Sequence, residues 1–139
     1  MKRVLVDTNV ALDVLLERQP HFAASAAVWD AIEGRLAEGY VAAHGVTTIH
    51  YLARKHLGAR GAQQVITSLL QVFRVAPVDG SVLQDALRHR GNDFEDAVSA
   101  SAARFAACDA IVTRDPKGHR ASAIPAFAPE AAVFFITGA

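Results

Sequence analysis

The chain has 139 residues, of which 52% are hydrophobic, and its 14 basic and 14 acidic side chains give a formal net charge of zero. A chain of this length folds as one domain by the usual size of domains, and it buries roughly two-thirds of the surface that it exposes when unfolded. The zero net charge excludes a general attraction to nucleic acid, although a local basic rim stays compatible with one. We therefore expect a single domain over residues 1–139.

The sequence predicts a cytoplasmic protein without a membrane segment. Apolar runs such as 97–107 are broken by Ser or Arg and are too short to span a bilayer. At the N-terminus, Asp7 interrupts the apolar run after three residues, which is too early for a signal peptide. The single Cys108 has no partner for an internal disulfide, which fits a reducing compartment.

Short aliphatic and β-branched runs alternate along the chain with longer segments of helical spacing. Strands are predicted at 3–6, 39–43, 73–78, 109–113 and 125–128. Helices are predicted at 10–17, 21–36, 46–56, 62–70, 81–90 and 93–107, with a last short helix opened by Pro129. Pro77 favours an edge position for the third strand. This alternation is typical of the α/β class, with a parallel sheet covered by helices on both faces.

Carboxylates stand where the predicted strands end. Asp7 follows the first strand, Asp115 follows the fourth, and the acidic stretch 92–96 opens the Ala-rich helix. In parallel sheets, ligands bind at the carboxyl ends of the strands. Carboxylates gathered without lysine repel one another, and a hard cation such as Mg²⁺ or Mn²⁺ relieves that repulsion. Such a cation also activates water and stabilises charge on a phosphoryl group, which is the chemistry of phosphodiester hydrolysis.

Each of these carboxylates also has a purely structural interpretation. Asp7 and Asp93 are well placed to cap the helices that follow them, and Glu95 and Asp96 would favour the positive end of a helix dipole. Asp93 and Asp96 share one helix face, whereas Glu95 points elsewhere. Asp115 begins a good turn sequence by itself. The three positions together indicate a site more strongly than any one of them.

Three segments in this order resemble the pattern of the PIN domain family. They are Val-Leu-Val-Asp-Thr-Asn at 4–9, Asp-Phe-Glu-Asp-Ala-Val-Ser-Ala-Ser-Ala at 93–102, and Cys-Asp-Ala-Ile-Val-Thr-Arg-Asp at 108–115. The resemblance implies a three-layer α/β/α sandwich with a central parallel sheet, and a Mg²⁺- or Mn²⁺-dependent endoribonuclease. Among single-domain bacterial members it implies the toxin of a VapBC-type toxin–antitoxin pair.

The resemblance also implies roles for individual residues and partners. Asp7, Asp96 and Asp115 match the metal-binding and catalytic aspartates, and Asn9 and Thr113 match polar residues that support them. RNA is the implied substrate and a cognate antitoxin protein is the implied partner. The sequence does not decide whether the chain also forms a homodimer.

The chain departs from the family pattern in the helix after the second strand. Such domains usually carry a Glu there, but residues 46–55 contain no carboxylate, and His50 lies about where the Glu would fall. His50 is either an ordinary helix residue or a substitute ligand or phosphate contact. Asp93, three residues before Asp96, is another possible source of the missing oxygen.

Two other functions compete with a nuclease. The first is a catalytically weakened module on the same fold that binds RNA or docks a partner, and the missing Glu favours it. The second is a phospho-acceptor receiver domain, which also gathers aspartates at strand ends. It needs an acceptor Asp after a middle strand, and 73–78 followed by Asp79-Gly80 fits that requirement poorly.

Overall fold

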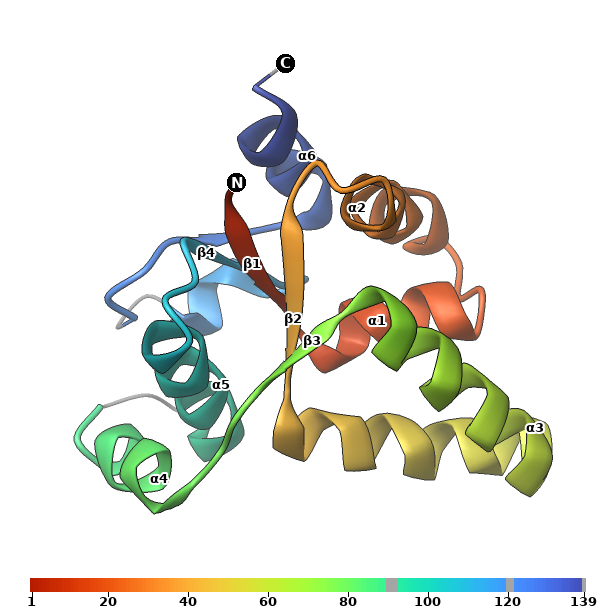
Figure 1. Cartoon of the computed structure of the whole chain (residues 1–139), viewed down its shortest axis with the longest axis horizontal. Coiled ribbons are helices and arrows are strands. Elements are labelled where there is room, and N and C mark those ends of the chain that lie inside the picture. The colour runs from red at the N-terminus through yellow and green to blue at the C-terminus, as the bar shows by residue number, and fades with distance from the viewer. Residues whose placement is uncertain (90–92, 120–121, 139) are drawn as a thin grey trace.

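A five-stranded parallel sheet forms the centre of the molecule in the computed structural model, which describes residues 1–89, 93–119 and 122–138. The strand order is β3-β2-β1-β4-β5 (Figure 1). The strands are β1 (Arg3–Val6), β2 (Glu38–Ala42), β3 (Arg74–Ala76), β4 (Ala110–Val112) and β5 (Ala126–Phe127). Every strand pair is parallel, and Leu5 of β1 lies in register with Tyr40 of β2 and Ile111 of β4. The predicted α/β fold with a central parallel sheet is confirmed.

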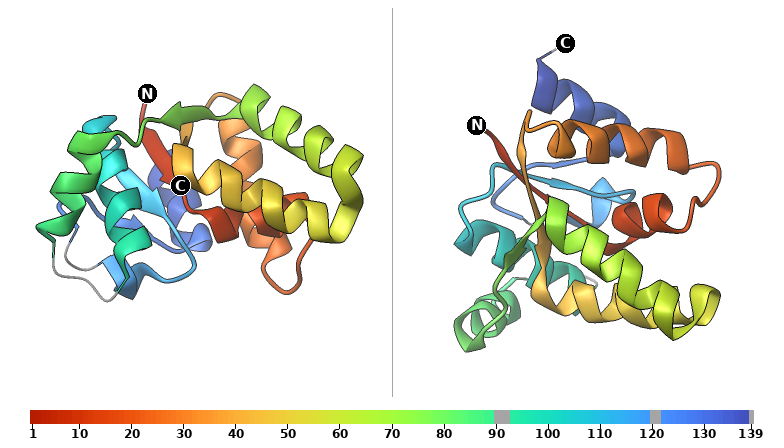
Figure 2. Two further views of the ribbon diagram at one scale, coloured as in Figure 1. Left: turned by 90° about the horizontal axis from the view of Figure 1, so that it is seen from below. Right: turned by 45° about the vertical axis from the view of Figure 1, so that its right-hand side comes forward.

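Helices cover both faces of this sheet, as Figures 1 and 2 show. They are α1 (Thr8–Leu15), α2 (Phe22–Glu33), α3 (Ala43–Val72), α4 (Gly80–Leu87), α5 (Phe94–Phe105) and α6 (Pro129–Thr137), with a short 3₁₀ helix, η1 (Pro116–His119). Helices α1, α2, α3 and α6 pack on one face, and α4 and α5 pack on the other. None of the helices described is long and apolar enough to cross a membrane.

Alternate residues of each inner strand point to opposite layers, so both faces of the sheet are apolar. Val4 and Val6 of β1 belong to the core under α1, α2, α3 and α6, whereas Leu5 belongs to the core under α4 and α5. In β4, Ala110 and Val112 face the first layer and Ile111 faces the second. Burial on both faces explains why the strands have continuous apolar runs without polar alternation.

The helix boundaries differ from the predicted ones at a few points that have local causes. The predicted helices 46–56 and 62–70 are the two arms of α3, which bends at Gly58, where φ is 75° and the backbone leaves the helical region. Helix α1 begins at Thr8 because Asp7 caps it, two residues before the predicted start. Strand β3 lies at the sheet edge, as Pro77 predicted. The predicted helix end at residues 90–91 lies outside the described residues.

Gly39 in β2 offers a test of this packing. A Cβ built at Gly39 would lie 2.6 Å from Ile32 and 2.8 Å from the Phe73 ring, so no side chain fits there. We expect Gly39→Ala to lower the free energy of unfolding by about 1–3 kcal/mol through overpacking. Gly80→Ala is the matched control, because a Cβ there has no atom within 4 Å. Urea denaturation should show the loss for the first variant only; equal midpoints would contradict the packing described.

Candidate metal centre

Asp7 stands at the point where β1 ends and α1 begins. Its backbone N–H donates to the carbonyl oxygen of Val112 at 2.9 Å, which ties the end of β1 to the end of β4. One carboxylate oxygen, Oδ1, accepts from the Thr8 N–H at 2.9 Å, and Oδ2 accepts from the Thr113 hydroxyl at 3.0 Å. The chain leaves β1 into α1 of one helix layer and leaves β4 into η1, which packs against α5 of the other layer, so Asp7 lies at the switch point where ligands bind in open α/β sheets.

Asp96 approaches Asp7 from the first turn of α5. Asp93 caps this helix by accepting the Asp96 N–H at 3.2 Å, which turns the chain so that Asp96 faces the sheet end. Burial is the main cause that raises the pKa of Asp96 to about 6, and the nearby carboxylates of Asp93, Asp7 and Glu95 add to it, whereas His119 opposes it. Asp96 therefore lies where a negative charge is unfavourable without a cation.

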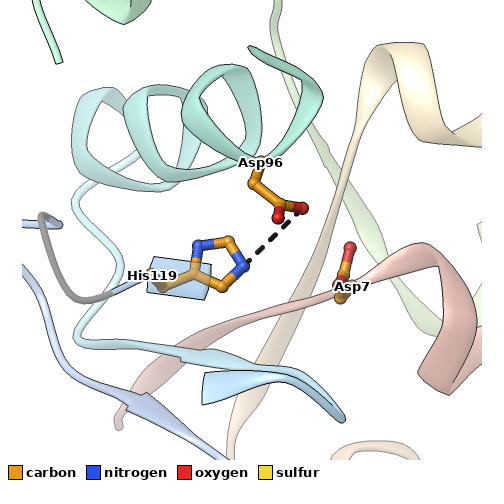
Figure 3. Close-up of side chains that lie close together, drawn as sticks. All are labelled: Asp7, Asp96 and His119. Carbon is orange, nitrogen blue, oxygen red and sulfur yellow. Dashed lines mark ion pairs between the residues drawn. The ribbon is translucent and has the colours of Figure 1, made fainter. Parts of the chain in front are cut away.

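His119 completes a group of three possible ligands. It ends η1, the turn that follows β4, and its side chain is 1% exposed. Figure 3 shows its ring directed toward the Asp96 carboxylate, with Asp7 facing the same space. His119 Nε2 lies 4.0 Å from Asp96 Oδ1, and ligand atoms of Asp7, Asp96 and His119 all lie within 4.8 Å of one another. Two carboxylates and an imidazole are donor types that divalent metal ions accept.

Asp115 borders this group from the other side of Gly118. It is exposed, and its N–H donates to the Thr113 hydroxyl at 3.1 Å, so Thr113 links Asp115 to Asp7. A Cβ built at Gly118 would lie 3.0 Å from Asp115 Oδ2 and 3.2 Å from Asp96 Oδ2. The absence of a side chain at Gly118 thus lets the two carboxylates face each other across the backbone.

Two other residues predicted to support the site, Asn9 and His50, are both exposed. Asn9 is exposed, and its side-chain oxygen accepts from Arg18 at 3.3 Å. His50 is exposed in the second turn of α3. The α3 residue that reaches α5 is His44, whose Nε2 lies 3.5 Å from the hydroxyl of Ser99, one turn after Asp96.

His119 was not among the predicted site residues. Histidines are scattered through the sequence without ligand spacing, and nothing in that pattern distinguishes His119 from the other five. The only signal is its place four residues after Asp115, in the connection that leaves the same strand end. The donor types nevertheless fit a divalent ion, because the half-buried Asp96 lies near other carboxylates and His119 Nε2 is a buried ring nitrogen without a hydrogen-bond partner among the described residues.

A PIN domain family model matches residues 3–117. The chain belongs to this family. No curated protein matches it at a significant level. The fold of this PIN domain is shared with solved structures of low sequence identity. FitAcB from Neisseria gonorrhoeae has 19% identity and a TM-score of 0.71, and the match covers 91% of this chain and 97% of that one.

Two further structures have the same fold. VapBC2 from Rickettsia felis, bound to a DNA fragment from its promoter, has 12% identity and a TM-score of 0.70 over 91% of this chain and 98% of that one. VapC20 from Mycobacterium tuberculosis, described as a toxin that cleaves the sarcin–ricin loop, has 19% identity and a TM-score of 0.63 over 78% of this chain and 86% of that one. At these identities the likeness shows the fold.

The raised pKa of Asp96 predicts a specific pH dependence of stability. The fold favours protonated Asp96, because the pKa rises from 3.8 to about 6 on folding. This contribution is fully present below pH 3.8 and is lost as the pH rises through about 6. In EDTA, wild type should therefore lose stability relative to Asp96→Asn between pH 4 and pH 7. Urea denaturation of both proteins at several pH values measures the difference, and a difference independent of pH would contradict this environment for Asp96.

Proposed function

We propose that this PIN domain is a metal-dependent endoribonuclease that hydrolyses RNA phosphodiester bonds and acts as the toxin of a type II toxin–antitoxin module. The observation that carries the proposal is the convergence of Asp7, Asp96 and His119 at the switch point of the sheet, with Asp115 beside them. Family membership supports nuclease chemistry, and the similar folds described as toxins or toxin–antitoxin complexes support the biological role.

Asp7, Asp96 and Asp115 are the carboxylates that we assign to hold Mg²⁺ or Mn²⁺. When bound, such an ion lowers the pKa of a coordinated water and stabilises negative charge on a phosphoryl oxygen. Thr113 and the Thr8 N–H fix both oxygens of Asp7, so this carboxylate needs no reorientation to bind a cation. Asp115 is the exposed carboxylate, and we assign it to accept a proton from the attacking water.

Basic side chains on α3 and η1 are the groups that we assign to bind the substrate. Helix α3 begins at the carboxyl end of β2 and contains no carboxylate over its whole length (Figure 1). It carries the exposed side chains of Arg54, Lys55 and Arg60, and Lys117 is exposed in η1 beside Asp115. In a chain of zero net charge, such exposed cationic groups are the ones that can contact the phosphates of RNA.

A catalytically weakened RNA-binding or partner-docking module is the second candidate. The observation that favours it is the absence of any carboxylate from α3, where the family pattern has a Glu. Such a module would keep the basic surface and bind RNA without cutting it.

Cleavage assays with purified protein decide between these functions. We expect wild type to cut a structured RNA with Mn²⁺ or Mg²⁺ and to lose that activity in EDTA, because the ion supplies the charge stabilisation. Asp7→Asn should reduce the rate by at least tenfold. Asp30→Asn is the matched control, since it removes an exposed carboxylate of α2. Cleavage by Asp7→Asn at the wild-type rate would assign the activity to a contaminant, and RNA binding without cleavage would favour the binding module.

The proposed role as a toxin predicts a small protein partner. We expect a short reading frame next to this gene, with a DNA-binding N-terminal part and an amphipathic C-terminal segment. Its product should form a stable complex with this chain on co-expression and should suppress RNA cleavage in the assay above. A product that forms no complex, as judged by size-exclusion chromatography, would contradict the toxin–antitoxin role while leaving the nuclease activity intact.

A further inference from the structure

His119 places a buried ring nitrogen next to two carboxylates of the candidate metal centre. Its side chain is 1% exposed, and Nε2 lacks a hydrogen-bond partner among the described residues. An unpaired polar atom in the interior is unfavourable, so native proteins rarely keep one without a function. Nε2 is directed toward Asp96 and Asp7, as Figure 3 shows.

The distance between His119 and Asp96 is informative. Nε2 lies 4.0 Å from Asp96 Oδ1, which is too long for a hydrogen bond. Two ligand atoms that each lie about 2.1 Å from one shared ion are separated by roughly 3–4 Å, because the ligands stand apart around it. The spacing of His119 and Asp96 falls at the wide end of that range, so the two side chains can bind one cation after a small inward movement of a group whose ligand atoms lie within 4.8 Å of one another.

The absence of carboxylates from α3 explains why a nitrogen donor would be useful at this site. Because α3 contains no carboxylate, the site lacks the oxygen donor that the family pattern supplies from that helix. His119 approaches the same two aspartates from η1, on the opposite flank of the sheet end. An imidazole there adds a ligand without adding a further negative charge next to Asp96, which is already surrounded by carboxylates.

We infer that His119 is a direct nitrogen ligand of the metal bound by Asp7 and Asp96, and that the site for this reason prefers Mn²⁺ and Co²⁺ to Mg²⁺. The inference rests on the metal site of the proposed function and adds to its three aspartates a nitrogen ligand and a selectivity among ions. Mg²⁺ takes oxygen ligands almost exclusively, whereas affinity for sites with nitrogen donors rises from Mn²⁺ to Co²⁺ along the first transition row.

Pulsed EPR of the Mn²⁺-loaded protein tests the ligand directly. Wild type should show a ¹⁴N coupling from a coordinated imidazole, and that coupling should disappear in His119→Gln. His44→Gln is the matched control, because His44 is the histidine of α3 that reaches α5, and it should keep the coupling. Labelling of histidine with ¹⁵N in wild type should change the coupling as expected for nitrogen, which assigns the coupling to an imidazole whether or not His119→Gln folds, and the loss of coupling in His119→Glu, a second variant, then identifies the residue.

Titration calorimetry tests the selectivity. Wild type should bind Mn²⁺ and Co²⁺ at least tenfold more tightly than Mg²⁺. His119→Gln should lose at least tenfold in affinity for Co²⁺ and less than threefold for Mg²⁺. His119→Glu, which restores an oxygen donor, should bind Mg²⁺ more tightly than His119→Gln does. Far-UV circular dichroism in EDTA checks that each variant is folded.

The possible failures are distinguishable. If Mn²⁺ binds wild type, Asp96→Asn abolishes that binding and no ¹⁴N coupling is seen, then His119 is not a ligand and the proposed nuclease site stands. A coupling that persists in His119→Gln and is lost in His44→Gln also overturns the inference. If no divalent ion binds at millimolar concentration, both the metal-dependent function and the ligand assignment are wrong.

Discussion

The site depends on the hydrogen bonds that join the ends of β1 and β4 and fix the position of Asp7. There are two of them, from the Asp7 N–H to Val112 and from the Thr113 hydroxyl to Asp7 Oδ2. They hold one carboxylate at the place where neighbouring parallel strands send the chain to opposite helix layers. Because Asp7 also caps α1, the same residue sets where the first helix starts. Folding of the sheet and assembly of the site are therefore coupled through a single side chain.

Helix α5 contacts or carries two carboxylates whose environments are opposite in character. The buried carboxylate of Asp85 in α4 accepts from Arg104 at 2.6 Å and from Ser101 at 2.8 Å, both on α5, and these donors lower its pKa to about 2. Asp96 in the first turn has a pKa of about 6 because burial and like charges dominate. The first carboxylate is neutralised inside the chain and joins α4 to α5. The second has an ion-pair contact only with His119, at 4.0 Å, among the described residues, which is the state expected of a group that receives an external cation.

Sequence patterns predicted the regular secondary structure, meaning the strands and helices. The apolar runs gave the parallel sheet because both of its faces are buried, and strand ends located Asp7 and Asp115 without any knowledge of contacts. The bend at Gly58 was predicted as a break between two helices, since a glycine at a helix end and one at a kink have the same local signature. Strand β5 has two residues and is shorter than predicted. Its length is set by its pairing with β4, which the local β-propensity of the sequence does not show.

The ligand geometry could not be predicted in the same way, because it depends on side chains brought together by an irregular turn. His50 falls near the family's Glu by counting residues along α3, yet it is exposed, whereas His44, six residues earlier, reaches α5. His119 lies in a 3₁₀ turn in which Gly118, without a side chain, leaves room for the carboxylates of Asp115 and Asp96. Helical or strand periodicity carries no information about such a turn. On the proposed assignment, a nitrogen ligand from η1 replaces a carboxylate from α3 while the strand-end aspartates keep their places, so the sequence shows the aspartates and only the three-dimensional structure brings His119 beside them.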